Sequence, residues 1–192
     1  DDLHRAALIA CEGLADYAKR LSAEAVRLAS DESSPARRQE LIEIARICKK
    51  VPLEPAETLH EALQALWLTH MAVCLEGSNS AVSFGRIDQY LYPYYRSNLN
   101  DPSFSPRQAK ELLAAFSIKM AEIIPVFSKP MMRFHGGMFN GQVVTVGGVD
   151  ENGNDTANEL SDLLLEIMDE LRMRQPNFHA RVHRGSPEAY RN

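Results

Sequence analysis

The chain has 192 residues, of which 45% are hydrophobic and 24% charged, and its formal net charge is −5. This is the composition of a folded globular protein, and the length suits one hydrophobic core. The negative charge, together with the absence of a run of Lys or Arg, argues against a binding surface for nucleic acid or anionic membranes. No segment approaches the roughly 18 consecutive apolar residues that a membrane-spanning helix needs. The first residues carry neither Met nor a signal-peptide pattern, so we expect a chain cut from a longer one.

The three cysteines, Cys11, Cys48 and Cys74, lie far apart in the sequence and among apolar neighbours. Their odd number and wide spacing suit neither a disulfide framework nor a zinc site. We therefore expect three small buried hydrophobic residues in a protein of the reducing cytoplasm.

Three helices are predicted before residue 76. In the first, apolar or small residues recur every three or four positions and predict one buried face: Ala7, Cys11, Leu14, Ala18, Leu21, Ala25 and Leu28. The second begins at Ser34, the expected N-cap, with Pro35 in its first turn. The third has Thr58 and Glu61 in the spacing of a capping box, and it is apolar nearly all round.

The least ordinary stretch follows, from Ser80 to Tyr95. Residues 81–84 predict a short buried strand, Gly85 allows a tight turn, and Asp88 can cap the aromatic-rich helix that follows. Arg86 and Asp88 are thereby placed together at a strand-to-helix corner. Two interpretations are open: a structural ion pair that holds the corner, or the wall of an active site.

The rest of the chain predicts further helices and two strands. These elements are a helix from Pro106 that Pro125 ends, a loop over 129–141, a strand over 143–146, a helix to Leu171, a strand over 177–183 and a helix that begins at Pro187. Capping boxes are predicted at Ser105 with Gln108 and at Thr156 with Glu159. The fold class is α/β, mainly helical with a few short strands.

One segment begins like the motif of a zinc-binding helix but lacks the second metal ligand. His60 and Glu61 begin like the two-histidine motif of zinc proteases, but Gln64 stands where the second His is needed. We predict no metal site.

Five segments, read together, resemble glycyl radical enzymes of the pyruvate formate-lyase-like group, which includes glycerol, choline and hydroxyproline lyases. The segments follow in the expected order over nearly the whole chain: Pro55 to Gln64, Ser83 to Tyr95, Thr145 to Gly148, Asn158 to Ser161 and Gln175 to Asn177. The Gly-Arg-x-Asp-Gln-Tyr block that begins at Gly85 is the most specific.

The resemblance implies a partial segment of an α/β barrel, with residues 1–192 as one incomplete domain. Such enzymes use a glycyl radical, installed by a radical-SAM activase, to form a thiyl radical that abstracts hydrogen from a small-molecule substrate. The family's Gly-Cys-x-Glu and Arg-Val-x-Gly-Tyr segments are not among these residues, so we expect no catalytic residue and no activity in this chain alone. Cys74 precedes Glu76 in a Cys-x-Glu pattern, but without the preceding glycine. A homodimer is compatible with the resemblance.

Ser83, Arg86 and Asp88 are the predicted substrate-binding residues, on the wall of the cavity. We expect Ser83 to face inward, and Val82 and Phe84 to face the outer helices, because successive residues of a strand point to opposite faces. Asp88 is then the counter-ion of Arg86.

The expected reaction of the intact enzyme is a radical elimination from a small hydroxylated or aminated substrate. Acyl transfer, as in a formate acetyltransferase, and decarboxylation are alternatives within the family. Gly141 stands directly before Gln142, where the family leads us to expect an aromatic residue, and Phe139 lies two places earlier, so the substrate stays open. A non-catalytic helical scaffold or interaction domain is the alternative from another class.

Overall fold

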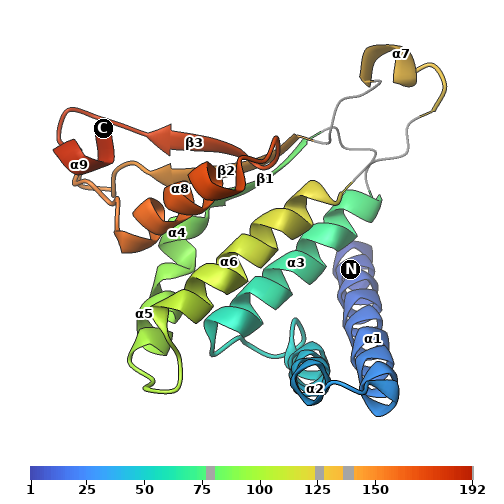
Figure 1. Ribbon diagram of the computed structural model, residues 1–192. Helices are drawn as coiled ribbons and strands as arrows, with labels where there is room; N and C mark the ends of the chain where they lie inside the picture. The colour runs from blue at the N-terminus through green and yellow to red at the C-terminus, as the bar shows by residue number, and fades with distance from the viewer. Residues whose placement is uncertain (77–80, 124–127, 136–140, 192) are drawn as a thin grey trace. The chain divides into compact units, whose positions relative to one another are not determined.

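A computed structural model describes residues 1–76, 81–123, 128–135 and 141–191 (Figure 1). The protein is mainly helical with three short parallel strands, as predicted. Residues 1–75 and 76–192 form two compact units, each of which is described by itself. Within the described ranges, no helix is both long enough and apolar enough to cross a membrane.

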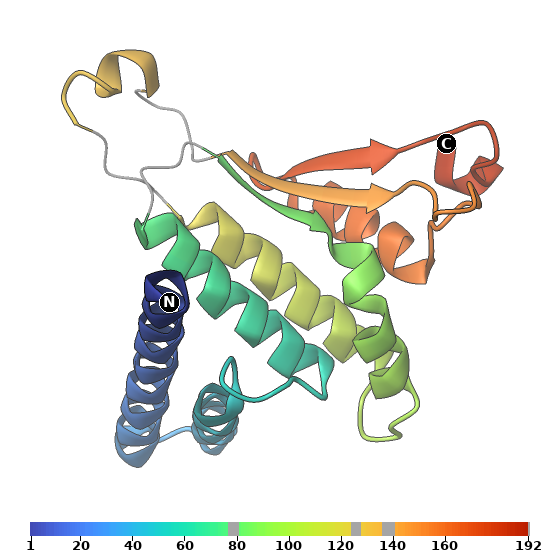
Figure 2. The same ribbon diagram turned by 180° about the vertical axis from the view of Figure 1, so that it is seen from behind.

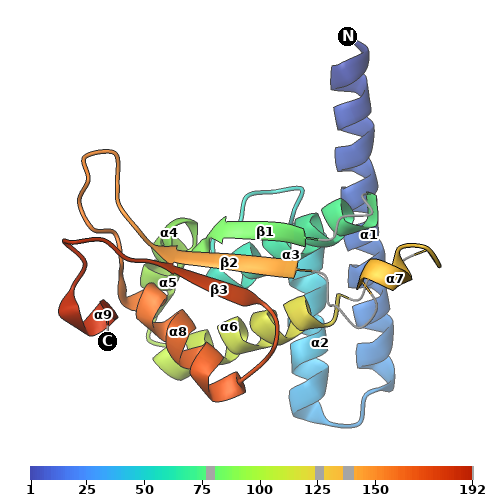
Figure 3. The ribbon, with the colours of Figure 1, turned by 90° about the horizontal axis from the view of Figure 1, so that it is seen from above.

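Three helices make up the first unit: α1 (Asp2–Asp31), α2 (Pro35–Lys50) and α3 (Leu59–Glu76). The predicted start of α2 is confirmed, because Ser34 is the N-cap and its side chain accepts a hydrogen bond from the Arg37 amide, with Pro35 in the first turn. Figure 3 shows α1 and α2 side by side, joined by a short connection. They form an antiparallel helical hairpin.

The buried face of α1 differs from the predicted one. It consists almost entirely of alanine: Ala15, Ala18, Ser22, Ala25 and Ala29. Ala18 and Ala25 belong to the predicted stripe, but Ala7, Cys11 and Leu28 are exposed. Small side chains let two helix backbones approach closely, and the Ser22 hydroxyl donates to the Ala45 carbonyl of α2 across 2.7 Å. The prediction from hydrophobicity alone therefore placed the buried face on the wrong side in part of α1.

The cysteines do not share one environment. Cys48 is buried in α2, and burial raises the pKa of its thiol. Cys74 is half-buried and Cys11 is exposed. The prediction of three buried cysteines is correct for Cys48 and wrong for Cys11.

The start of α3 has half of the predicted capping box. The Glu61 amide donates to Thr58 Oγ1 at 3.2 Å, as expected. The Glu61 carboxylate, however, accepts from the amide of Glu57 and from two cations of α2, Arg46 at 2.9 Å and Lys50 at 2.8 Å. It thereby ties α3 to α2 within the first unit.

The second unit contains three strands and six helices among its described residues. They are β1 (Ala81–Arg86), α4 (Ile87–Tyr90), α5 (Tyr92–Leu99), α6 (Pro106–Ala121), α7 (Met132–His135), β2 (Gly141–Gly147), α8 (Glu159–Leu171), β3 (Asn177–Arg181) and α9 (Glu188–Arg191). The expected aromatic-rich helix is two short helices, α4 and α5, and the expected loop over 129–141 contains α7. Ser80, Pro125 and Phe139 lie outside the described residues.

The three strands form one parallel sheet in the order β1-β2-β3. Figures 1 and 2 show α6 and α8 on the same side of this sheet. The space between is filled by buried apolar side chains of the sheet and both helices: Phe84, Val144, Val146, Leu113, Phe116, Met120, Leu160, Leu164 and Ile167. This is the core of the second unit, and it leaves the other face of the sheet uncovered by these helices.

The two predicted capping boxes of this unit had different outcomes. At α6 the box of Ser105 and Gln108 is confirmed. At α8 the cap is not Thr156 but Asn158, whose side chain accepts from the amide of Ser161 while the Ser161 hydroxyl accepts from the Asn158 amide. The predicted box is wrong because the Thr156 hydroxyl has tertiary partners instead.

Candidate functional site

A bulge shapes the end of β1. Ser83 pairs with Val143 of β2, but Gly85, two residues further on, pairs with Val144, the next residue of β2. Gly85 has a φ of 67°, a left-handed backbone conformation that favours glycine. The strand can therefore turn into α4 immediately after Arg86.

Ser83 and Phe84 lie on opposite faces of the sheet. The Phe84 ring is buried and meets Phe116 of α6 edge to face, with 5.3 Å between the ring centroids. Ser83 is exposed on the other face. Its hydroxyl oxygen accepts a hydrogen bond of 3.1 Å from the Gly85 amide, and the hydroxyl donates a long bond of 3.5 Å to the Val143 carbonyl. Phe84 thus faces the helices, as expected, and the binding role of Ser83 stays a prediction.

Asp88 is completely buried, but it is not the counter-ion of Arg86. Its Oδ2 accepts from the Gly147 amide at 2.7 Å and from the Ser161 hydroxyl at 2.6 Å, and its backbone carbonyl accepts from the Asn158 side chain at 3.1 Å. Asp88 also does not cap α4, whose N-cap is Arg86 without a side-chain bond. A buried carboxylate needs such donors to offset its desolvation, and here it joins α4, the end of β2 and the start of α8.

Arg86 anchors the turn between β2 and α8. Its guanidinium donates to the Val149 carbonyl at 3.2 Å and to the Thr156 hydroxyl, which itself donates to the Gly148 carbonyl at 3.0 Å. No ion pair joins Arg86 to a carboxylate of the described residues, so the predicted pair with Asp88 is wrong. The residues were correctly placed at one corner, but each binds a different segment. A guanidinium has five N–H donors, so these two bonds leave capacity for another acceptor.

Tyr190 of α9 closes the same corner from the far end of the chain. A Cβ atom added to Gly147 would collide with the Tyr190 hydroxyl oxygen, so the ring lies directly against the glycine backbone. Burial, with the negative charge of Asp88 nearby, raises the pKa of Tyr190 to about 12. Sequence analysis gave no reason to connect Tyr190 with Asp88. The local sequence signal for this contact is the glycine at position 147, since its backbone φ of 68° favours glycine.

A second polar cluster lies beside this corner. Asp155 Oδ2 is 2.6 Å from His183 Nε2 and accepts from the Ser186 hydroxyl at 2.9 Å, while His183 Nδ1 accepts from the Gly185 amide at 3.2 Å. Burial alone would raise the pKa of Asp155, but these donors and the Ala157 amide outweigh it and hold the pKa below its usual value. Because the serine donates to Asp155 and both histidine nitrogens are engaged, the cluster is not arranged as a nucleophilic triad.

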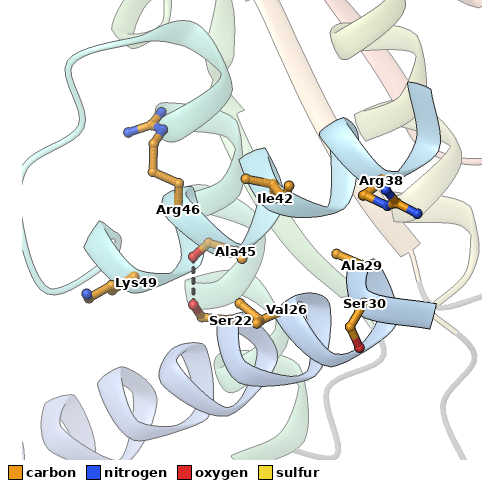
Figure 4. Close-up of a pocket in the computed structure, with 9 residues that line it drawn as sticks. All are labelled: Ser22, Val26, Ala29, Ser30, Arg38, Ile42, Ala45, Arg46 and Lys49. Carbon is orange, nitrogen blue, oxygen red and sulfur yellow. Dashed lines mark hydrogen bonds between the residues drawn. The ribbon is translucent and has the colours of Figure 1, made fainter. Parts of the chain in front are cut away.

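The first unit has a groove of about 620 Å³ between α1 and α2, shown in Figure 4. Its apolar lining consists of Val26, Ala29, Ile42 and Ala45, and three cations, Arg38, Arg46 and Lys49, also line it. Arg38 donates to the Glu32 carbonyl, and Arg46 binds Glu43 and Glu61. These two guanidiniums already have protein acceptors, and none of the predicted site residues lies in the groove.

The comparison with protein families covers the whole chain. Residues 1–192 match the family described as pyruvate formate lyase-like. The chain belongs to this family. The resemblance inferred from five short segments is therefore confirmed for the complete sequence.

Relatives of this pyruvate formate lyase-like chain are glycyl radical enzymes. Isethionate sulfite-lyase of Nitratidesulfovibrio vulgaris is 36% identical over 96% of this chain and 23% of its own length. A glycyl radical enzyme from Archaeoglobus fulgidus is 44% identical, with a TM-score of 0.87 over 93% of this chain and 23% of that one. The glycerol-bound B12-independent glycerol dehydratase from Clostridium butyricum is 33% identical, with a TM-score of 0.86 over 94% of this chain and 22% of that one.

The chain thus spans less than a quarter of the length of each of these relatives. The fold described above is a partial segment of a glycyl radical enzyme barrel. Within that segment, the corner of Arg86, Asp88 and Tyr190 fixes where β1 and β2 end. The position of Ser83 on the uncovered face of β1 depends on this corner, because Gly85 and Arg86 lie only two and three residues after it.

Proposed function

We propose that this chain forms part of the cavity wall of a glycyl radical lyase, in which a small hydroxylated or aminated substrate undergoes radical elimination. The glycyl radical, which a radical-SAM activase installs, and the thiyl radical that it forms belong to other segments of such an enzyme. The contribution of this chain is to shape the cavity, orient the substrate and keep water away from the reacting atoms.

The match over residues 1–192, with TM-scores of 0.86 and above to solved glycyl radical enzymes, is the observation that carries this proposal. One of those structures is a glycerol-bound dehydratase, and a curated relative is a sulfite-lyase. Both enzymes break a bond to a leaving group in a small hydroxylated compound. This common chemistry favours elimination over the alternatives.

The three predicted residues divide their roles in this proposal. Ser83 faces the cavity and offers a hydroxyl to the substrate. Arg86 reaches the edge of the same face while it holds the turn at Val149 and Thr156. Asp88 contacts no substrate and positions the other two, because it is completely buried between α4, β2 and α8.

Acyl transfer, as in a formate acetyltransferase, and decarboxylation are alternatives within the same radical chemistry. A non-catalytic helical scaffold is the alternative from another class, and the match to enzymes along the whole chain disfavours it. Each alternative makes a different product from a different substrate, so one set of assays separates them.

The test uses the whole protein that contains this chain, prepared without oxygen and incubated with a matched radical-SAM activase and S-adenosylmethionine. Electron spin resonance should give a glycyl doublet, and the activated enzyme should release water or sulfite when offered glycerol or isethionate. The 192 residues alone serve as the negative control and should give no doublet.

Three results contradict the proposal in different ways. Formation of an acyl-coenzyme A from pyruvate, without elimination from either alcohol, assigns the enzyme to acyl transfer. Release of carbon dioxide from a carboxylic acid assigns it to decarboxylation. No glycyl doublet in the whole protein, under conditions that activate a known glycyl radical enzyme, favours the scaffold.

A further inference from the structure

The two faces of the sheet differ in chemistry. On the face toward α6 and α8, Val144 and Val146 are fully buried and Phe84 is 7% exposed. On the other face, Ser83 and His179 are exposed and Thr145 is half-buried. The first face is mainly apolar and covered, with the buried Gln142 as a polar exception. The second face is mainly polar, with the half-buried Val143 among its residues, and the described residues do not cover it.

The strand register gathers the polar residues into one patch. Ser83 of β1, Val143 of β2 and Asn177 of β3 lie in one row, and Thr145 and His179 lie beside each other in a second row on the same face. Neighbouring strands are about 4.8 Å apart, and positions two residues apart along a strand are separated by about 6.6 Å. The side chains of Ser83, Thr145, Asn177 and His179 can therefore contact a single small molecule.

A polar face is unusual for a parallel sheet. Such sheets are normally buried on both sides, and their strands are apolar throughout. Covering Asn177 and His179 with an apolar layer would leave an amide and an imidazole without partners, at a cost in desolvation. The composition of this face fits a polar ligand better than it fits a second hydrophobic layer.

We propose that Asn177 and His179 are substrate-binding residues that determine specificity, and that together with Ser83 and Thr145 they select a neutral or anionic hydroxylated substrate. The inference rests on the proposed function and narrows its substrate class. The four side chains supply hydroxyl, amide and imidazole groups, all of which can donate hydrogen bonds to substrate oxygens. None of the four is a carboxylate, so the patch lacks the charge that would hold a quaternary ammonium or another cation.

The experiment compares His179→Gln and Asn177→Leu in the whole enzyme with two controls. His4→Gln removes an exposed histidine of α1. Ala180→Ser changes the next residue of β3 after His179, and Ala180 pairs with the buried Val146 of β2. Calorimetry measures binding of glycerol, isethionate and choline to the enzyme before activation. Electron spin resonance then measures the glycyl radical, and steady-state kinetics gives KM and kcat.

We expect glycerol or isethionate, but not choline, to bind the parent enzyme. His179→Gln and Asn177→Leu should each weaken that binding or raise KM at least tenfold, with an unchanged unfolding midpoint and unchanged radical yield, while both controls stay within twofold of the parent. If the parent enzyme forms no glycyl radical, the proposed function is wrong. Even then, weaker binding of glycerol or isethionate in His179→Gln and Asn177→Leu, but not in the controls, supports the assignment of these two residues to substrate binding. The assignment of Asn177 and His179 is overturned if both variants bind glycerol and isethionate as tightly as the parent enzyme does. It is also overturned if the parent enzyme binds choline alone or none of the three compounds.

Discussion

The Ser161 hydroxyl donates a hydrogen bond of 2.6 Å to Asp88, although 73 residues separate the two in the sequence. The same carboxylate oxygen accepts from the Gly147 amide at 2.7 Å. Asp88 is thus the point at which α4, β2 and α8 meet, and its side chain and the two residues that donate to its carboxylate, Gly147 and Ser161, are buried.

Replacing Asp88 by alanine should therefore destabilise the protein by about 3 kcal/mol, because two buried donors lose their acceptor. Urea unfolding followed by circular dichroism measures the change. Ser161→Ala, which removes a single donor, should cost about 1 kcal/mol. The control is Asp162→Ala, which removes an exposed carboxylate from the next position of α8. An Asp88→Ala variant as stable as this control would contradict the role assigned to Asp88.

Gly147→Ala should be far more damaging than Gly153→Ala. Both glycines have positive φ, 68° and 83°, so either substitution places alanine in a strained backbone conformation. This strain should lower the free energy of unfolding by about 1 kcal/mol. Only at Gly147 does the new Cβ also collide with Tyr190, whereas nothing lies within 4 Å at Gly153. We expect Gly147→Ala to lower the free energy of unfolding by about 3 kcal/mol in total. Combining Gly147→Ala with Tyr190→Ala should cost less than the sum of the two single changes, and simple additivity would show that the contact is absent.

The carboxylate of Glu61 should make the first unit sensitive to acid. Burial alone would raise its pKa, but hydrogen bonds from Lys50, the Glu57 amide and Arg46 lower it from 4.5 to about 2. The group therefore contributes about 3 kcal/mol of stability above pH 4.5, which is lost as the pH falls toward 2.

Glu61→Gln tests this by its pH dependence. The difference in unfolding free energy between the parent and this variant should be largest near pH 7 and should shrink steadily below pH 4.5. Glu57→Gln, which removes the exposed carboxylate that also binds Lys50, should show a much smaller dependence. A constant difference from pH 7 to pH 3 would rule out a depressed pKa at Glu61.

Ser83→Ala should impair turnover of the whole enzyme without unfolding it. The side chain is exposed, so its loss creates no cavity. If the hydroxyl binds substrate in the transition state, kcat/KM should fall about tenfold, equivalent to one hydrogen bond. Ser103→Ala, in an exposed turn after α5, is the matched control. Full activity of Ser83→Ala would remove this residue from the cavity wall.

The cysteines should react with a thiol reagent at different rates. Cys11 is exposed and should be labelled first, and Cys48, which is buried with a raised thiol pKa, should be labelled last and more than about tenfold more slowly. Single Cys→Ser variants assign the phases. Equal rates for Cys11 and Cys48 in the folded chain would be inconsistent with the environments described.

Sequence patterns predicted features that depend on neighbouring residues. The caps at Ser34 and Ser105, the short strand from Ala81 and the turn at Gly85 all follow from interactions within a few positions. Such local signals give the type of each element and most of its limits.

Features set by distant partners were missed or misread. Thr156 and Asn158 are both good N-cap residues, and the choice between them depends on Arg86, about 70 residues away, which binds the Thr156 hydroxyl. Asp88 was paired with the nearest cation in the sequence, whereas its partners are Gly147 and Ser161. The family resemblance identified the corner, but only the fold could give its hydrogen bonds.

The parallel pairing of β1 with β2 also has a consequence for how the chain folds. Ala81 pairs with Gly141, so about 60 residues must be made before β1 gains its neighbour, and closing such a loop costs entropy that local contacts do not repay. The hairpin of α1 and α2, by contrast, needs only its short connection. During synthesis we expect this hairpin to form first and the sheet last, so that the segment from Ala81 to Arg86 is the part most exposed to aggregation or chaperone binding.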